Sequence, residues 1–316
     1  MRVVTAEEID GVLLMPSLIE ALDRAFRGGI TAPPRHHHAV ARPDGDATLL
    51  LMPAWSARGA SGEFLGVKTV SVFPGNRARG LPSVQGTYLL MDGATGEPLA
   101  ALDGARLTLW RTAAASALAA RHLARPDAGR MLMVGAGALA PFLIRAHAAV
   151  RPLNRIAIWN RNPAPATALA ARLAAEGWPA VAAGDDLARE VAGADLVSCA
   201  TLSETPLVRG EWLTAGSHLD LVGAFTLGMR EADDVALARA SVHVDTEACT
   251  VEGGDVAVAI RAGTFDRAAI RGDLADLVTG RAPGRTSPDE ITLFKSIGAS
   301  LEDLAAAIEV WRSLAT

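Results

Sequence analysis

A glycine-rich run in the middle of the chain could bind a dinucleotide. Residues 134–140 are Val-Gly-Ala-Gly-Ala-Leu-Ala, which matches the pattern G-x-G-x-x-G/A with alanine at the third small position. The first glycine of this pattern allows a tight turn, and the second lets the backbone approach a pyrophosphate. The helix that follows offers free N–H groups to the phosphates. We therefore expect a nicotinamide coenzyme to bind here, the alternative being an ordinary glycine turn, and the expected contacts are Gly135, Gly137, Ala138 and Leu139.

The tip of the next apolar run bears on which coenzyme binds. Asn160, Arg161 and Asn162 follow a run that ends at Trp159. Sites that prefer NAD usually have an acidic residue about 20 positions after the glycines, which binds the ribose hydroxyls. A guanidinium instead binds a 2′-phosphate through charge-assisted hydrogen bonds. We predict that these three residues contact NADP(H) in preference to NAD(H), with a merely solvated Arg161 as the alternative.

Three basic residues in the first third of the chain could bind an anion. Lys68 lies at the centre of the β-prone run 64–73, where a partly buried lysine needs a partner or a function. Arg111 is predicted near the start of a long helix, where a positive charge opposes the helix dipole and suits a bound anion. Arg35 follows two prolines that stiffen its segment. Together they predict a carboxylate pocket, the alternatives being an edge-strand lysine in water and a surface ion pair.

The histidines and cysteines do not form a metal-binding pattern. His36, His37 and His38 are consecutive, so their side chains point in different directions along an extended segment and do not easily share one ion. Cys199 and Cys249 are the two cysteines, too few for a disulfide framework or a four-thiolate zinc site. We expect no metal and two reduced, buried thiols.

The central part of the chain alternates short apolar runs with alanine-rich stretches of helical length. Buried strands that alternate with helices predict βαβ units and a parallel sheet. We therefore expect an α/β fold, with a doubly wound, Rossmann-type dinucleotide-binding domain over residues 125–286. The runs are residues 131–134, 156–159, 195–199, 218–222 and 242–245.

The N-terminal third and the C-terminal end predict a second, α+β domain. A capping box at Thr5–Glu8 starts a helix, and the turn 92–96 joins two strands. A helix over 109–123 leads to a boundary at 125–127, and Ser287–Glu290 has the pattern of another capping box. The last helix, from about Ser300, is expected to pack on the first third. We predict a substrate-binding and dimerisation domain formed by 1–124 with 287–316; its expected strands are 64–73, 84–91 and 98–102.

Composition limits the class of protein. The chain has 316 residues, 50% hydrophobic and 21% charged, with a net charge of −5. This apolar content suits packed cores rather than disorder, and the length favours two domains. The acidic balance argues against a nucleic-acid partner. The sequence has no apolar run long enough to span a membrane, and its first residues do not form a secretory pattern. We therefore expect a cytoplasmic protein.

In their order, these pieces resemble the ornithine cyclodeaminase/μ-crystallin family along nearly the whole chain. The resemblance rests on Pro34-Arg35, Gly66-Val67-Lys68-Thr69, Leu81-Pro82-Ser83, the stretch from Asp103-Gly104 to Arg111-Thr112-Ala113-Ala114, the glycine loop, Asn160-Arg161, and residues 291–298. It implies a homodimer built through the N-terminal domain and an active site in a cleft between domains. It implies that Arg35, Lys68 and Arg111 contact a substrate carboxylate or its surroundings. Further implied contacts are Thr112 with a phosphate, and Thr201, Val222 and Ser296 near the nicotinamide half of the coenzyme.

One departure from the family bears on its chemistry. Cyclodeaminases carry an aspartate shortly after the glycine of the segment that here is Leu221-Val222-Gly223-Ala224-Phe225. Phe225 stands at the matching place and can neither accept a proton nor hold an ammonium group. We therefore expect an NADPH-dependent oxidoreductase that reduces a small cyclic ketimine carboxylate to L-proline or L-pipecolate. The alternatives are an ornithine cyclodeaminase, an amino-acid oxidoreductase of the alanine dehydrogenase type, and a non-enzymatic NADPH-dependent ligand binder.

Overall fold

The chain divides into two compact units in the computed structural model, which describes residues 1–42, 45–57, 59 and 63–315. Unit 1 comprises Met1–Arg111 and Ala299–Thr316, and unit 2 comprises Thr112–Gly298. The sequence placed the divisions at 124/125 and 286/287, whereas the compact units divide at 111/112 and 298/299. The first division therefore falls inside helix α3, Gly104–Leu123, rather than after it.

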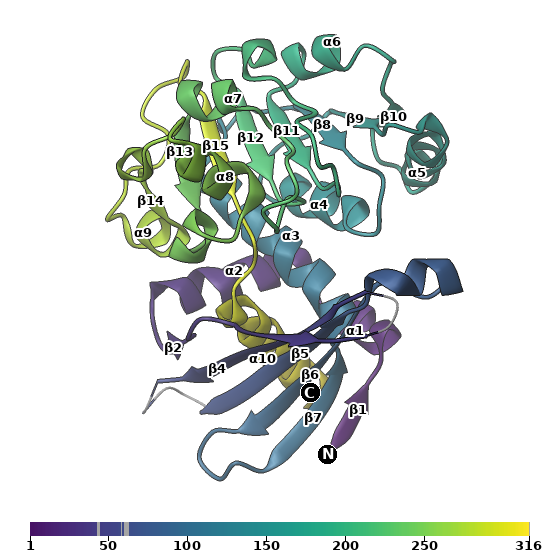
Figure 1. Cartoon of the computed structure of the whole chain (residues 1–316), viewed down its shortest axis with the longest axis vertical. Coiled ribbons are helices and arrows are strands. Elements are labelled where there is room, and N and C mark those ends of the chain that lie inside the picture. The colour runs from purple at the N-terminus through teal and green to yellow at the C-terminus, as the bar shows by residue number, and fades with distance from the viewer. Residues whose placement is uncertain (43–44, 58, 60–62, 316) are drawn as a thin grey trace. The chain divides into compact units, whose positions relative to one another are not determined.

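Unit 1 is built on a seven-stranded sheet (Figure 1). The strand order is β1-β7-β6-β5-β4-β2, with β3 also paired to β4. β1 runs parallel to β7, and the other pairs are antiparallel. The strands are β1 Arg2–Val4, β2 Ile30–Thr31, β3 His36–Val40, β4 Ala47–Ser56, β5 Phe64–Val72, β6 Val84–Asp92 and β7 Pro98–Asp103.

Helices α1, α2 and α10 belong to the same unit as this sheet. The predicted capping box is confirmed, since Thr5 and Glu8 each accept a hydrogen bond from the other's backbone N–H at the start of α1. The last helix, α10, contacts α2 and strands β4, β5 and β6. The bounds are α1 Ala6–Val12, α2 Met15–Arg27 and α10 Ser300–Ala315, with a short 3₁₀ turn η1 at Pro74–Arg79.

Two local expectations for unit 1 are borne out. Residues 64–73 were expected to form a strand and contain β5. The turn between β6 and β7 forms because the Asp92 carboxylate accepts hydrogen bonds from the backbone N–H groups of Ala94 and Thr95.

The helix expected over 109–123 begins five residues earlier, at Gly104, so the prediction that Arg111 lies at a helix start is wrong.

Unit 2 is an eight-stranded parallel sheet in the order β10-β9-β8-β11-β12-β15-β13-β14, which confirms the doubly wound α/β prediction. Buried apolar side chains fill the central strands, as expected for strands covered on both faces. The strands are β8 Arg130–Val134, β9 Arg155–Trp159, β10 Ala180–Ala182, β11 Leu196–Cys199, β12 His218–Leu221, β13 Ser241–Val244, β14 Gly272–Asp273 and β15 Thr292–Lys295.

The helices of unit 2 follow the strands in a β-α alternation (Figure 1). Helix α5 begins where Asn162 caps it, with Pro163 in the first turn. The bounds are α4 Ala140–Ala148, α5 Pro163–Ala175, α6 Leu187–Ala192, α7 Asp234–Arg239, α8 Gly254–Ala262 and α9 Leu274–Thr279, with 3₁₀ turns η2 Gly210–Trp212, η3 Glu247–Thr250 and η4 Arg267–Ala269.

Strand β15 comes from the segment that the sequence assigned to the other domain. It pairs with β12 on one side and β13 on the other, so residues 292–295 lie inside the parallel sheet. The prediction of a helix after Ser287 is wrong, because the described residues 280–291 contain no helix. Glu290 accepts hydrogen bonds from Thr286 instead, and the chain then enters β15.

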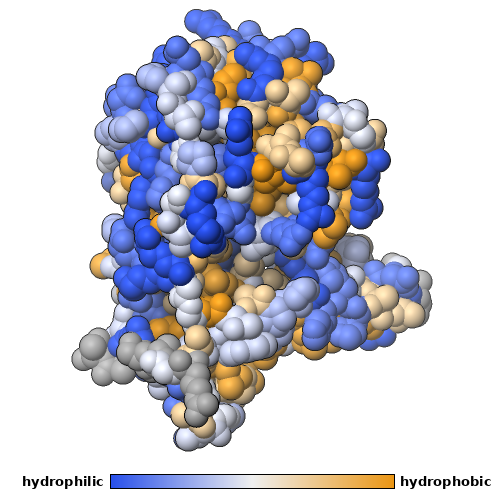
Figure 2. All heavy atoms as spheres, turned by 90° about the vertical axis from the view of Figure 1, so that its left-hand side faces the viewer, coloured by the Kyte–Doolittle hydropathy of each residue, from blue (hydrophilic) through white to orange (hydrophobic). Residues whose placement is uncertain are grey.

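Hydropathy is mixed on the face drawn in Figure 2, where hydrophilic residues cover most of the surface and hydrophobic side chains lie among them in groups. Within the described ranges, every helix is too short or too polar to cross a membrane.

Candidate active and coenzyme-binding sites

Lys68 is a buried cation in unit 1. It lies in β5, which is paired with β4 on one side and β6 on the other, so the edge-strand alternative is wrong. The lysine is 2% exposed. Its Nζ lies 2.8 Å from both Asp303 Oδ1 and Asp303 Oδ2, and it donates to Thr108 Oγ1 at 3.3 Å. The predicted need for a partner is therefore met by a carboxylate on α10.

Arg111 joins the same cluster from α3. Its Nε donates to Asp303 Oδ1 at 3.0 Å, and its NH1 donates to Glu302 Oε2 at 2.7 Å. Both carboxylates are fully buried, so this is an interior ion-pair network and not the surface pair considered as an alternative. Two cations and two anions balance within the cluster, as buried charges generally require.

The electrostatics of the cluster lower the pKa of Lys68 to about 8. Burial is the largest cause, and the neighbouring Arg111 lowers it further, while Asp303 and Glu302 raise it. The ammonium therefore loses its proton far more readily than an exposed lysine. A lysine of this kind can donate a proton near neutral pH.

The acidic half of this cluster was missed by sequence reasoning. Glu302 and Asp303 were included in the C-terminal helix and given no role. The available signal was a pair of acids in the first turn of α10, which is also an ordinary helix-start pattern. Lys68 and Asp303 are 235 positions apart, so the sequence alone did not show that they meet.

Tyr88 and Gly66 complete the surroundings of Lys68. Tyr88 is paired with Lys68 across β5 and β6, and its side chain is fully buried. A Cβ atom at Gly66 would lie 2.4 Å from the Tyr88 hydroxyl oxygen, so this position needs glycine. Arg35, the third predicted carboxylate contact, precedes β3 and is half-buried.

The glycine loop of unit 2 has the predicted strand–turn–helix context. Gly135 follows β8 directly and has φ +111°, a conformation that favours glycine. A Cβ at Gly135 would lie 2.6 Å from the carbonyl oxygen of Ala200, so the loop also packs closely on the segment after β11. At Gly137, by contrast, a Cβ would meet open space among the described atoms. The second glycine thus borders room that a pyrophosphate can enter.

Two further observations fit a bound dinucleotide. Helix α4 begins beyond Ala138 and Leu139, and in the part of the chain that is described no side chain caps it. Its first N–H groups therefore suit a phosphate. Ser296 follows β15 and is 2% exposed, and its Oγ lacks a hydrogen-bond partner in the described chain. An unsatisfied buried hydroxyl at the carboxyl end of a parallel strand suits a ligand group.

The Asn160–Asn162 segment is tied to its surroundings. The Asn160 side chain donates to the Asn162 carbonyl at 2.8 Å, and Asn162 caps α5 by accepting from Ala164 N at 3.1 Å. Arg161 NH2 donates to Ser203 Oγ at 3.2 Å, so its guanidinium is anchored to the loop after β11 rather than fully solvated. Asn160 and Arg161 also line a cavity of about 130 Å³.

The remaining predicted contacts lie on different elements of unit 2. Thr201 and Val222 follow the neighbouring strands β11 and β12, whose carboxyl ends meet at one edge of the sheet. Thr112 is buried in α3. The structure thus brings Thr201 and Val222 to the edge that holds the glycine loop; for Thr112 it shows burial alone.

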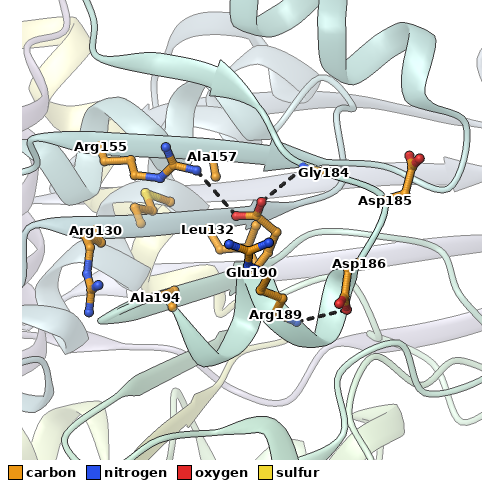
Figure 3. Close-up of a pocket in the computed structure, with 12 residues that line it drawn as sticks. Arg130, Leu132, Arg155, Ala157, Gly184, Asp185, Asp186, Arg189, Glu190 and Ala194 are labelled. Carbon is orange, nitrogen blue, oxygen red and sulfur yellow. Dashed lines mark hydrogen bonds and ion pairs between the residues drawn. The ribbon is translucent and has the colours of Figure 1, made fainter.

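A larger cavity of about 540 Å³ in unit 2 holds none of the predicted residues. Its walls include the first residues of β8 and β9, Arg130 and Arg155, and the segment from Gly184 to Ala194 (Figure 3). Glu190 accepts a hydrogen bond from Gly184 N at 3.1 Å and lies 3.7 Å from Arg155. These charges neutralise one another, so the cavity does not resemble the expected coenzyme site.

The two cysteines and the three consecutive histidines lie on separate elements. Cys199 and Cys249 are buried free thiols, as predicted. His36–His38 lie on β3, and the described residues contain no group of three metal-ligating side chains.

Comparisons with known proteins give consistent matches along the whole chain. A family model described as the ornithine cyclodeaminase/mu-crystallin family matches residues 1–315. Protein SAR DEFICIENT 4 of Arabidopsis thaliana is 43% identical over 282 residues, covering 88% of this chain and 86% of that protein. Delta(1)-pyrroline-2-carboxylate reductase of Paracoccus denitrificans is 41% identical over 294 residues, covering 92% of this chain and 91% of the relative. The structure of Thermococcus litoralis Delta(1)-pyrroline-2-carboxylate reductase in complex with NADH and L-proline matches with a TM-score of 0.93 and 30% identity, covering 100% of this chain and 98% of that one.

Proposed function

The chain belongs to the ornithine cyclodeaminase/mu-crystallin family, and from this premise we propose that it reduces a small cyclic ketimine carboxylate with NADPH. The substrate is Δ1-pyrroline-2-carboxylate or Δ1-piperideine-2-carboxylate, and the product is L-proline or L-pipecolate. The relatives named as reductases support this class of reaction.

Phe225 is the observation that carries the choice among the chemistries of the family. It lies four residues after the end of β12, and its side chain is 39% exposed. A benzyl group provides an apolar wall for a flat ring and offers no carboxylate for a substrate amine. Cyclodeamination needs such a carboxylate at this place, so the residue favours reduction.

The Lys68–Arg111 cluster gives the substrate carboxylate its binding groups. An ammonium has three N–H donors, and two of those on Lys68 are used by Asp303 and Thr108. Arg111, with help from Lys68 and Arg35, holds the carboxylate and so orients the imine carbon, and such alignment supplies much of the rate enhancement. Lys68, with its pKa of about 8, delivers a proton toward the imine nitrogen directly or through water.

The coenzyme supplies hydride when it is bound at the glycine loop of unit 2. Gly135, Gly137, Ala138 and Leu139 hold its pyrophosphate, and Thr112 contributes a phosphate contact. Thr201, Val222 and Ser296 face its nicotinamide half. Asn160, Arg161 and Asn162 hold the adenosine end and favour NADP(H), because an arginine rather than an acidic residue stands beside the ribose position.

The enzyme acts as a homodimer assembled through unit 1 in the cytoplasm. Light scattering on the purified chain tests the dimer, which has about twice the mass of 32.8 kDa. The related structures include one described as a dimer of an archaeal alanine dehydrogenase, which supports this assembly.

A substrate panel tests the proposed reaction. Purified protein should oxidise NADPH with Δ1-pyrroline-2-carboxylate or Δ1-piperideine-2-carboxylate, and not with pyruvate plus ammonia. Turnover with pyruvate plus ammonia alone would indicate an alanine dehydrogenase. Ammonia release from ornithine without net change in the coenzyme would indicate cyclodeamination, and coenzyme binding without turnover of any imine would indicate a ligand binder.

A further inference from the structure

Glu231 is a fully buried carboxylate in unit 2 that belongs to none of the motifs described above. It accepts four hydrogen bonds from two loops. Its Oε1 accepts from Thr201 N at 2.6 Å and from Thr201 Oγ1 at 2.8 Å. Its Oε2 accepts from Gly223 N at 2.6 Å and from Ala224 N at 3.3 Å. One side chain therefore fixes the loop after β11 and the loop after β12.

These two loops lie against each other and against the glycine loop. A Cβ at Gly223 would lie 2.1 Å from the Thr201 carbonyl oxygen, so the backbones of the two loops touch. A Cβ at Gly135 would lie 3.2 Å from Thr201 Cγ2. In doubly wound sheets, ligands bind beyond the carboxyl ends of the strands, where the strand order reverses. In this sheet the order reverses between β8 and β11, beside Thr201.

A second layer of buried charge holds Glu231 itself. The backbone N–H groups of Glu231 and Ala232 donate to Asp255 Oδ1 at 2.7 and 3.0 Å. Asp255 Oδ2 lies 3.2 Å from Lys295 Nζ, and Lys295 directly precedes Ser296. Asp255 and Lys295 are as fully buried as Glu231. The network therefore links the loops after β11 and β12 to the end of β15.

Keeping an ionised carboxylate here is energetically costly. Burial raises the pKa of Glu231 to about 7, while Lys295 lowers it and Asp255 raises it. A neutral side chain would avoid that cost. A carboxylate, however, has two oxygens that accept hydrogen bonds and no donor, so it alone can satisfy four converging N–H and O–H donors.

We propose that Glu231 is a positioning residue that sets the Thr201 loop and the Val222–Ala224 loop in the geometry that receives the nicotinamide half of the coenzyme. This inference rests on the proposed function, in which Thr201 and Val222 face that half. Glu231 acts through these loops and does not touch the coenzyme.

The test compares a whole coenzyme with a fragment that lacks the nicotinamide. In Glu231→Gln an amide NH2 group takes the place of one carboxylate oxygen. Two of the four donors then face another donor in place of an acceptor. We expect the Kd of NADPH to rise roughly 10- to 100-fold and kcat to fall, because about two hydrogen bonds to a charged acceptor are lost. The Kd of 2′-phospho-ADP-ribose should stay unchanged. Calorimetry gives both values, and NADH with ADP-ribose provides a second matched pair.

Glu190→Gln is the control for removing a carboxylate from unit 2. Glu190 also accepts a backbone N–H, that of Gly184, but it lines the cavity that holds none of the predicted coenzyme contacts. This variant should bind NADPH and the fragment as the wild type does. Should Glu231→Gln fail to fold, Glu231→Asp keeps the negative charge but draws the carboxylate back from its four donors, and it should weaken NADPH binding several-fold without affecting the fragment.

If the binding of NADPH and the binding of the fragment were weakened equally, the proposal would be overturned, because Glu231 would then support the fold in general. Unchanged binding of both ligands in a folded Glu231→Gln protein would overturn it as well. The two Kd comparisons use no substrate, so a wild type that binds NADPH but turns over no ketimine would contradict the proposed reaction and leave the binding result standing.

Discussion

Asp303 is the residue on which the chemistry of Lys68 depends. It contacts Lys68 Nζ with both carboxylate oxygens and also accepts from Arg111 Nε. Since burial and Arg111 both favour the neutral amine, the acids on α10 keep the Lys68 ammonium populated near neutral pH.

Asp303→Asn should therefore shift the alkaline limit of activity. The Lys68 ammonium is lost as the pH rises through about 8, so kcat/KM should fall above that pH in the wild type. Removing the neighbouring negative charge lowers the pKa of Lys68 further, and the falling limb should move down by about one pH unit or more. The measurement is a pH profile of kcat/KM with a saturating coenzyme.

Glu309→Gln is the matched control for this shift. Glu309 lies on the same helix, and its contact is Arg24 at 3.9 Å rather than Lys68. Its profile should overlay that of the wild type. If Asp303→Asn kept the wild-type limb, the titrating group would not be Lys68.

Arg161→Ala should reduce the preference for NADP(H). The guanidinium is anchored to Ser203 beside the glycine-loop edge, where it can pair with a 2′-phosphate. Losing that contact should lower the kcat/KM ratio of NADPH to NADH roughly 10- to 100-fold. Arg172→Ala, an exposed arginine on α5, should leave the ratio as it is. A ratio that does not fall in Arg161→Ala would reject this role.

At the scale of elements, the two glycines of the strand–turn–helix unit from β8 to α4 have different roles. Gly135 serves both folding and coenzyme binding, whereas Gly137 serves coenzyme binding alone. Gly135→Ala meets both a positive φ and the Ala200 carbonyl, so it should lower the thermal midpoint by a few degrees and also weaken coenzyme binding. Gly137→Ala meets open space, so the apo protein should keep its midpoint and lose coenzyme affinity. Thermal scans with and without NADPH measure both effects, and an unaltered affinity in Gly137→Ala would move the pyrophosphate elsewhere.

Elements whose signals are local could be predicted from the sequence. The glycine loop, the Thr5 capping box and the Asp92 turn each depend on neighbouring residues, and all three are present. Strand β15 could not be predicted in this way. Its apolar residues follow Ser287-Pro288-Asp289-Glu290, a pattern typical of a helix start, and its true place depends on pairing with β12 and β13. The Asp303 and Glu231 contacts were missed for the same reason, since they join distant segments.

At the scale of the whole molecule, the division of the chain predicts which fragments fold. A fragment of residues 112–298 contains every strand of the parallel sheet, whereas 125–286 lacks β15 and leaves β12 and β13 without their shared partner. We expect the longer fragment to unfold cooperatively and to bind NADPH, and the shorter one to aggregate. Circular dichroism melts and calorimetry test this, and a folded, NADPH-binding 125–286 fragment would contradict it.

Strand β15 is synthesised after both of the strands that it pairs with, and this order affects folding during translation. Ribosomes add roughly 5–20 residues per second, so β12 and β13 are synthesised seconds before the strand that separates them. During that interval the nascent chain exposes two apolar strand edges that could pair with each other or with another chain. Productive folding of the coenzyme domain therefore waits until β15 has been synthesised, and holdase chaperones or slowed elongation between β13 and β15 would act at this step.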